Sequence, residues 1–372
     1  MPDSEELIGS VLDANGKHRT AMFQAIASEE AVVFVGAGLS APLGYPTWDA
    51  LLQLLGQRAN ALAAFQPASS NPLLLADQIK KHFVDNQGED EYYSTLGRTY
   101  GESHDGCTQT HRRLARLRFR AYVTPNYDPC LERALCDYAG EIGVRVRADY
   151  GIPVATGREN RHLVSKFLRS LSEKFNPGGR YVAHIHGSYM GPRDIILTMA
   201  DYERAYGISL GEGSQGKAPI VTIHRELLWS LLATRRVVFI GCSMDDPYIQ
   251  VLLDTVCSDL WEWNVGSHFV ILPLDIQNAG MASTINDRFG RYGMQPVFFN
   301  NLDGRFSNLD KLLEEAIQQW QPPIAPGTVS TSEKAKTAEE VPPATESRQK
   351  LGHQWLENIN EKTTRELKQN ED

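Results

Sequence analysis

The chain has 372 residues, a formal net charge of −9 and a hydrophobic content of 42%, which suit one large α/β domain with insertions and a sizeable core. The acidic balance argues against a protein that coats nucleic acid, so we expect no direct nucleic-acid binding. No run of about 18 apolar residues predicts a membrane span, and the acidic first residues lack the apolar region of a signal peptide.

Apolar runs alternate with helical patterns along the chain. Strands are predicted at 31–35, 119–124, near 144–148, and at 181–185, 194–198, 236–240, 268–272 and 295–299. Helices are predicted at about 5–28, at 48–62, 73–84, 108–117, 128–138, 161–174, 222–233 and 246–257, around 287, and at 306–320. This alternation predicts an α/β fold with a doubly wound, mostly parallel sheet.

The predicted domain organisation has three parts. Residues 1–320 form the main domain, in which 66–118 and 140–178 are interpreted together as insertions that build a smaller helical lobe. The composition changes at Gln321, and residues 321–347 have the Pro, Ser, Thr, Glu and Lys content of a flexible linker. The pattern of residues 348–372 predicts a C-terminal helical tail, which is either a docking element or a fraying polar terminus.

Four polar blocks stand at or just beyond the ends of predicted strands. They are Gly36-Ala37-Gly38-Leu39-Ser40, Thr124-Pro125-Asn126-Tyr127-Asp128, His186-Gly187-Ser188 and Gly241-Cys242-Ser243-Met244-Asp245-Asp246-Pro247. Open α/β sheets bind ligands at that edge. In the first block, glycines allow the backbone to approach a ligand, and the N-terminus of a following helix presents N–H groups to a phosphate.

In this order the blocks resemble the sirtuin fold, and more closely the sirtuin-like domain of bacterial NAD-degrading anti-phage defence proteins, over about residues 28–300. The resemblance implies a Rossmann-like sirtuin fold with NAD as the substrate and catalysis by Asn126 and His186. It implies that Asp128 contacts the nicotinamide amide and that Thr124 also belongs to the NAD-binding positions. The pyrophosphate and the adenosine-side ribose or phosphate would then be contacted by Gly36, Ala37, Gly38, Ser40, Gly241 and Ser243.

The chemistry of the two catalytic candidates agrees with that implication. An amide such as Asn126 can hold a water and a ribose through its paired donor and acceptor, and His186 can accept a proton near neutral pH. Two alternatives remain open, since Asn126 could cap the helix that follows it and His186 could be a core histidine. His184 lies inside the strand and suits a core role, and Asp245 and Asp246 are expected to cap the next helix.

The cysteines separate this sequence from deacylating sirtuins, which carry a zinc ribbon with two CxxC pairs. No such pair is formed by Cys107, Cys130, Cys136, Cys242 and Cys257. We therefore expect no zinc, and the scattered thiols indicate a reduced, cytoplasmic protein. The segment Pro46-Thr47-Trp48 also departs from the acidic-aromatic-arginine sequence of deacylases, and both differences favour cleavage of NAD by water.

The leading hypothesis is an NAD hydrolase that depletes NAD during phage infection and is regulated by a partner or by oligomerisation. The alternatives are a sirtuin-type protein deacylase or ADP-ribosyltransferase, and a non-catalytic nucleotide sensor. A homo-oligomer is expected. By resemblance alone, the partner would be a HerA-type hexameric ATPase or a short Argonaute.

Overall fold

The structure is a computed structural model that describes residues 4–59, 72–101, 106–144, 151–153, 161–172, 180–208, 220–242, 244, 246–260 and 268–320. The chain divides into two compact units, Met1–Pro322 and Pro323–Asp372, and the second lies outside the described residues. The expected linker at 321–347 and tail at 348–372 lie outside them too. None of the helices in the described ranges is both long and apolar enough to cross a membrane.

The described strands form one seven-stranded sheet in the order β3-β4-β2-β1-β5-β6-β7, and each neighbouring pair is parallel. Their bounds are β1 Ala31–Val35, β2 Tyr122–Thr124, β3 Gly151–Pro153, β4 Val182–His184, β5 Arg236–Ile240, β6 His268–Leu274 and β7 Met294–Asn300. The chain first builds the half of the sheet beyond β1, where β4 lies between β2 and β3, and then builds the other half outward from β5. The boundary between β1 and β5 is thus the topological switch point, where open α/β sheets hold ligands.

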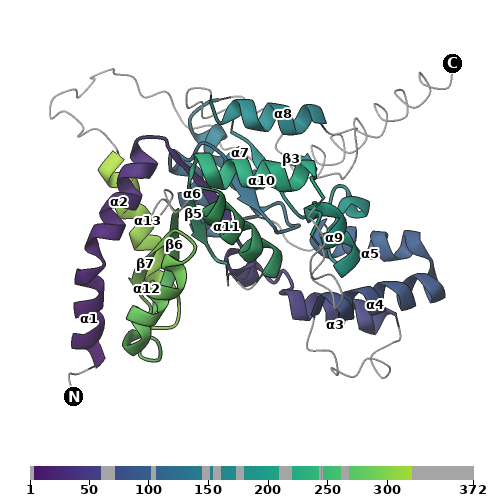
Figure 1. The fold of residues 1–372 in the computed structure, drawn as a ribbon, viewed down its shortest axis with the longest axis horizontal. Coiled ribbons are helices and arrows are strands. Elements are labelled where there is room, and N and C mark those ends of the chain that lie inside the picture. The colour runs from purple at the N-terminus through teal and green to yellow at the C-terminus, as the bar shows by residue number, and fades with distance from the viewer. Residues whose placement is uncertain are drawn as a thin grey trace, which may run out of the picture. The chain divides into compact units, whose positions relative to one another are not determined.

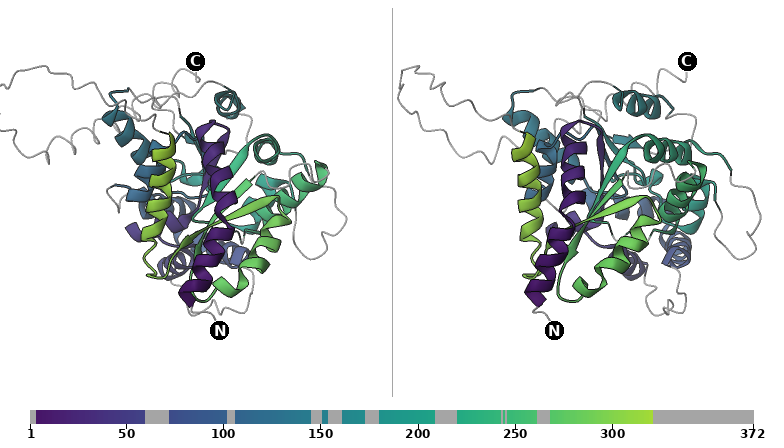
Figure 2. Two further views of the ribbon diagram at one scale, coloured as in Figure 1. Left: turned by 90° about the vertical axis from the view of Figure 1, so that its left-hand side faces the viewer. Right: turned by 60° about the vertical axis from the view of Figure 1, so that its left-hand side comes forward.

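Helices connect these strands. Their bounds are α1 Ser4–Ala14, α2 Gly16–Ala27, α3 Trp48–Arg58, α4 Pro72–Gln87, α5 Glu89–Gly101, α6 Gln109–Arg116, α7 Cys130–Glu141, α8 Arg161–Ser170, α9 Met199–Tyr206, α10 Ile223–Thr234, α11 Pro247–Asp259, α12 Ala282–Gly290 and α13 Ser307–Trp320. Figure 1 shows α10 and α11 side by side, while α3, α4 and α5 gather near α9. Both views of Figure 2 show α13 alongside α2.

Both faces of the sheet are buried, which is why the central strands are continuous apolar runs. In β1, Val33 and Val35 pack with side chains from α2, α3, α6, α7 and α13, whereas Val32 and Phe34 pack with side chains from α8 to α11. Side chains of a strand alternate between the two faces, so these two clusters lie on opposite sides. The predicted α/β fold with a doubly wound parallel sheet is confirmed.

The expected helix over residues 5–28 is two helices that meet at Asn15. The buried Asn15 amide donates from Nδ2 to the Pro296 carbonyl at 2.8 Å, and its Oδ1 accepts from the Phe298 amide at 3.0 Å. Both partners belong to β7, which lies at the end of the strand order. Asn15 therefore bonds to the outer edge of β7 at the point where α1 ends and α2 begins.

The strand expected at 194–198 was wrong. Pro192–Asp194 is a single turn of 3₁₀ helix, and the buried residues 195–197 run in an irregular segment into α9, a helix that the pattern did not predict. The strand expected near 144–148 falls mostly outside the described residues, and a short strand stands instead at Gly151–Pro153.

Candidate functional site

The Gly-rich turn after β1 packs against the backbone that leaves β5. The Gly36 amide donates to the Ile240 carbonyl at 2.8 Å, and the Gly38 amide donates to the Gly241 carbonyl at 3.0 Å. A Cβ atom on Gly36 would lie 2.4 Å from the Gly241 oxygen, and one on Gly38 would lie 2.9 Å from it. Glycine is therefore required here by the neighbouring loop, and these two amides are bonded within the protein.

The segment after the turn differs from the expected phosphate-binding helix. Ala37–Leu39 and Ala41–Leu43 are single 3₁₀ turns, and the next α-helix begins only at Trp48. A 3₁₀ turn of this length has no α-helical macrodipole comparable to that of a long helix. Any phosphate contact by Ala37 or Ser40 would therefore come from local groups of the turn.

Asn126 is held by hydrogen bonds to both sides of its peptide backbone. Its amide donates to Thr124 Oγ1 at 3.0 Å, and that hydroxyl donates to the Val35 carbonyl at 2.7 Å. Its carbonyl accepts from His184 Nδ1 at 2.8 Å. The side-chain amide, in a residue that is 9% exposed, donates from Nδ2 to Ser40 Oγ at 3.4 Å. The structure thus brings Ser40, Thr124 and Asn126 together.

The capping interpretation of Asn126 is excluded by where the next helix begins. Helix α7 begins at Cys130, and Pro129 is its N-cap residue. The side chain that bonds its first turn is the buried Asp128, whose Oδ1 accepts from the Cys130 amide at 3.0 Å. One oxygen of Asp128 therefore bonds to the first turn of α7, while the Asn126 amide remains at the sheet edge beside Ser40.

His184 is buried in the last position of β4 and faces α7. Its Nε2 contacts Glu132 Oε1, and its Nδ1 donates to the Asn126 carbonyl. Burial lowers the pKa of His184, but the charge and hydrogen bond of Glu132 more than offset it, so the pKa rises from 6.5 to about 9. His184 is thus an imidazolium at neutral pH, a core role that the sequence predicted only in part.

His186 follows β4 through a tight turn. Gly187 has a φ of +84°, and a Cβ on it would lie 2.6 Å from the Asp194 carbonyl oxygen, so only glycine fits there. The amide of Ile196 donates to the His186 carbonyl at 2.8 Å and fixes the returning segment against the turn. These contacts direct His186, which is 3% exposed, toward α9.

The ring of His186 lies between two tyrosine hydroxyls of α9. Its Nε2 is 2.9 Å from Tyr206 Oη, and its Nδ1 is 3.3 Å from Tyr202 Oη. Tyr202 donates its hydroxyl proton to Asp246 Oδ2 at 3.1 Å, so the network assigns the His186 proton to Nδ1. Nε2 then keeps an acceptor lone pair. Burial lowers the pKa of His186 to about 3, and the ring is neutral.

Asp246 has a second role in this network. Its Oδ1 accepts from the amides of Tyr248 and Ile249 at 2.9 and 3.1 Å, which confirms the expected capping of the following helix. Burial raises the pKa of Asp246. One carboxylate therefore begins α11 and orients Tyr202, which in turn holds His186. Two further residues lie outside the described residues: Asp245, which was expected to cap the same helix, and Ser243, which was expected to contact NAD.

Sequence reasoning missed the residues that surround His186. Tyr202 and Tyr206 stand one turn apart on α9, and His224 of α10 lies with its ring centroid 6.5 Å from that of His186. His224 is 4% exposed, and neither of its ring nitrogens has a hydrogen-bond partner among the described residues. Burial lowers its pKa to about 3, and repulsion between the two rings when protonated adds to that effect. A signal was present, because Thr198 and Asp201 form a capping box that marks the start of α9.

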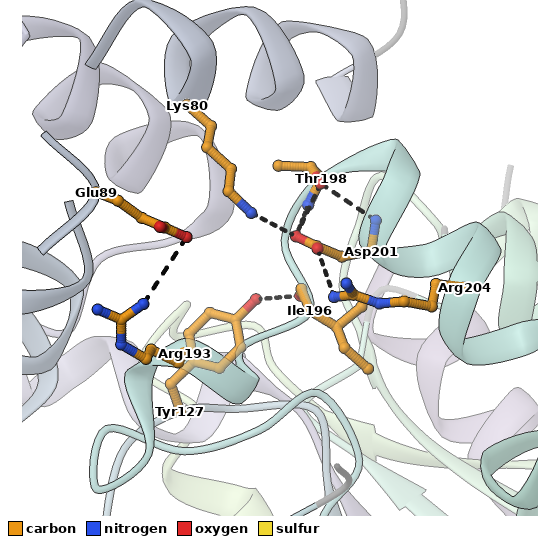
Figure 3. Close-up of polar contacts among 8 residues, drawn as sticks. All are labelled: Lys80, Glu89, Tyr127, Arg193, Ile196, Thr198, Asp201 and Arg204. Atoms are coloured by element: carbon orange, nitrogen blue, oxygen red, sulfur yellow. Dashed lines mark hydrogen bonds and ion pairs between the residues drawn. The ribbon is translucent and has the colours of Figure 1, made fainter. Parts of the chain in front are cut away.

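Helix α4 contacts this region through the first turn of α9, and α5 contacts the preceding 3₁₀ turn, where Glu89 pairs with Arg193 at 3.8 Å (Figure 3). Lys80 Nζ lies 3.5 Å from Asp201 Oδ2, and Arg204 donates to Asp201 Oδ1 at 3.0 Å. In the same view, Tyr127 donates to the Ile196 carbonyl at 2.8 Å. The helix that carries both His186 partners is thus fixed by an ion pair and by the block that contains Asn126.

Asn126 and His186 are brought to neighbouring strand ends. Each lies two residues beyond Thr124 and His184, which are directly paired in the sheet. Within the described ranges, no hydrogen bond joins the two side chains, so they flank the sheet edge rather than form a dyad. In the part of the chain that the structure describes, no group of three or more His, Cys, Asp and Glu side chains could hold a metal ion.

Similarity to known proteins extends over most of the chain and includes this region. A family model described as a SIR2-like domain matches residues 120–292. The chain is 26% identical to NAD(+) hydrolase ThsA of Acinetobacter baumannii over 78% of this chain and 53% of that protein. It is 25% identical to proteins of the same name from Bacillus cereus and Enterococcus faecium, over 66% and 67% of this chain and 44% of each relative.

The chain thus spans about half the length of the curated relatives it matches. A crystal structure of a Sir2 homologue–NAD complex overlaps 81% of this chain and 93% of that chain, with a TM-score of 0.37 and 12% identity. The family match covers the Asn126 block, the His186 block and Gly241, and it confirms the resemblance that the sequence motifs indicated. Residues 120–292 are therefore similar to SIR2-like domains.

Proposed function

We propose that the chain hydrolyses NAD⁺ at the bond between nicotinamide and ribose, releasing nicotinamide and ADP-ribose. The observation that carries this proposal is the placement of a buried amide, Asn126, and a neutral histidine, His186, at neighbouring ends of β2 and β4. The matched relatives named NAD(+) hydrolase support it.

The chemistry of this bond suits weak, well-placed polar groups. Nicotinamide is a cationic leaving group, and the ribose passes through an oxocarbenium-like state, as in glycoside hydrolysis. Water therefore needs a partner that orients it and accepts its proton as the bond forms. Neutral His186 would accept that proton at Nε2 once water replaces the Tyr206 hydroxyl that donates there, and Asn126 can hold water and ribose through its amide.

The remaining NAD contacts follow from the strand ends in the same proposal. Gly36, Ala37, Gly38 and Ser40 would border the pyrophosphate at the switch point, and Gly241 and Ser243 the adenosine side. Because the Gly36 and Gly38 amides bond to Ile240 and Gly241, we assign these glycines a steric role that keeps the turn close to β5. Thr124 acts through the Asn126 backbone, and Asp128 would approach the nicotinamide amide.

The test is incubation of the purified chain with NAD⁺, followed by chromatography of the products. We expect nicotinamide and ADP-ribose in equal amounts. Addition of an acetylated peptide separates the alternatives, because a sirtuin-type deacylase would form O-acetyl-ADP-ribose. Intact NAD⁺ in every condition, with NAD⁺ bound, would instead favour a nucleotide sensor.

The biological role belongs to the same proposal. Uncontrolled hydrolysis of NAD⁺ would harm the host, so we propose an abortive-infection effector whose activity is gated by a partner or by self-assembly in the cytoplasm. We also propose a main domain at 1–320, with insertions at 66–118 and 140–178, a linker at 321–347 and a tail at 348–372 that contacts the partner. Deletion of 322–372 should change oligomer size, partner binding or basal turnover, and unchanged values for all of these would overturn the role of the tail.

A further inference from the structure

We propose that His184 and Glu132 are a positioning pair that sets the Asn126 amide by holding its backbone carbonyl. Neither residue would touch the substrate. The inference deepens the proposed function, because the reaction it serves is the proposed hydrolysis of NAD⁺. It names a charged pair behind the site as one determinant of the turnover rate.

The protonation state of His184 follows from its two partners. The Asn126 carbonyl, 2.8 Å from Nδ1, is an acceptor only, and the Glu132 carboxylate at Nε2 accepts as well. A neutral imidazole carries one N–H and could serve only one of them. Both hydrogen bonds are made together when the ring is an imidazolium, in agreement with the direction of its pKa shift.

As a consequence, both backbone polar groups of Asn126, its N–H and its C=O, are held by hydrogen bonds. Thr124 holds the amide N–H and His184 holds the carbonyl, so the peptide plane on either side of the Cα is restrained. The side chain then points its amide toward Ser40 with little rotational freedom in the backbone that carries it. Effective catalysis needs reacting groups placed to within fractions of an ångström, so loss of one restraint lowers turnover.

The position of the pair favours this role over simple core packing. Val182, two residues earlier in β4, lies on the same face of the sheet as His184 and packs there among apolar side chains. A buried ion pair stabilises a core no better than apolar residues of similar volume. The His184 side chain is 1% exposed and the Glu132 side chain is 13% exposed. Only His184 contacts Asn126 directly, and Glu132 acts on Asn126 through His184.

The experiment compares Glu132→Gln, His184→Gln and His184→Lys with Glu141→Gln. Glu141 lies on the same helix, where its carboxylate pairs with Arg116 at the surface, so this variant removes a charge from α7 without touching the site. We expect kcat to fall about tenfold or more in the first two variants with little change in KM. Lysine keeps the cation beside Glu132 and should restore part of the rate.

A second readout does not depend on activity. In protein labelled with ¹⁵N-asparagine, the Asn126 side-chain amide signal is identified by its loss in Asn126→Asp. It should shift in His184→Gln and Glu132→Gln and stay in place in Glu141→Gln. In the parent protein it should titrate near pH 9, and that titration should vanish in His184→Gln; the charged groups that act on His184 are Glu132 and Asp128.

Each outcome decides one of the two proposals. A parent chain that cleaves no NAD⁺ refutes the proposed function, while the amide signal still tests the pair. An unmoved amide, or unchanged kcat in folded Glu132→Gln and His184→Gln variants, overturns the positioning role. If His184→Gln fails to fold, Glu132→Gln decides. Failure of both to fold, with Glu141→Gln intact, would make the pair a structural element only.

Discussion

Two histidines separated by one residue, His184 and His186, occupy opposite surroundings. His184 faces α7 and contacts a carboxylate and a carbonyl, so it carries a charge at neutral pH. His186 faces α9, between two tyrosine hydroxyls, and burial keeps it neutral. Their sequence contexts are similar, and the difference comes from the helices that face them.

The contrast shows how one strand end can supply two kinds of group. A permanent charge is useful where a backbone must be held, because charge-assisted hydrogen bonds are short and strong. A neutral ring is useful where a lone pair must accept a proton, because an imidazolium has none to offer. The predictions below test this division from the largest expected effect to the smallest.

Removal of the groups proposed to meet the substrate should have the largest effect. His186→Ala and Asn126→Ala should each lower NAD⁺ turnover about a hundredfold or more, because each removes a positioned polar group from the proposed site. Turnover is measured by chromatography, and circular dichroism confirms the fold. Near-normal turnover in a folded Asn126→Ala protein would remove the active-site assignment.

The two histidines should make stability depend on pH in opposite directions. The pKa of His184 in the folded protein is about 9, above its unfolded value, so its contribution is complete below pH 6.5 and is lost as the pH rises toward 9. The pKa values of His186 and His224 are about 3, so the unfolded chain binds their protons first and stability falls as the pH drops from 6.5.

Urea unfolding at several pH values measures both effects. In His184→Gln the alkaline loss of unfolding free energy should diminish while the acid loss remains. An alkaline loss of the same size in that variant would show that His184 is not the charged group. His111 and His268 have pKa values lowered by burial to about 4, and they add to the acid limb in both proteins.

The tyrosine pair offers a smaller and more selective test. Tyr202→Phe breaks the link from Asp246 to His186 Nδ1 and should lower turnover by up to about tenfold, the scale of one hydrogen bond. Tyr206→Phe removes only the hydroxyl at Nε2 and should cost less, because the substrate would occupy that position. Equal losses in the two variants would argue against Nδ1 as the protonated nitrogen.

The smallest effect is expected at the contact between α4 and α9. Lys80→Met removes one cation from Asp201, whose carboxylate keeps Arg204 and Thr198 as partners. The unfolding free energy should fall by about 1 kcal/mol or less, since the Lys80 side chain is 25% exposed. A loss of several kcal/mol in thermal or urea unfolding would mean that this ion pair is essential for docking α4 on α9.

The sequence was most informative where burial is uniform. Ala31–Val35 and Arg236–Ile240 were predicted with the bounds that the structure has, because both strands are central and four or five consecutive apolar side chains are buried on the two faces. The same rule failed at residues 195–197, which are equally buried but form no strand. An apolar run reports burial, and it does not report whether its backbone pairs with another strand.

The positions of the candidate residues were predictable from the sequence, but their electrostatics were not. Strand ends placed Asn126 and His186 at one edge, and the position of His184 within the strand indicated its burial. The charge of His184 depends on Glu132, which is 52 residues away in sequence and meets it only through the packing of α7 on the sheet. The neutrality of His186 depends on α9, a short helix of eight residues that periodicity did not detect.

The side chain of Asn15 also bears on how this protein behaves among its own copies. An edge strand offers unpaired N–H and C=O groups that can recruit a strand from another molecule. By occupying the Phe298 amide and the Pro296 carbonyl, Asn15 denies both groups to such a strand. The junction of the first two helices thus leaves these two backbone groups of β7 unavailable for pairing with a strand of another copy.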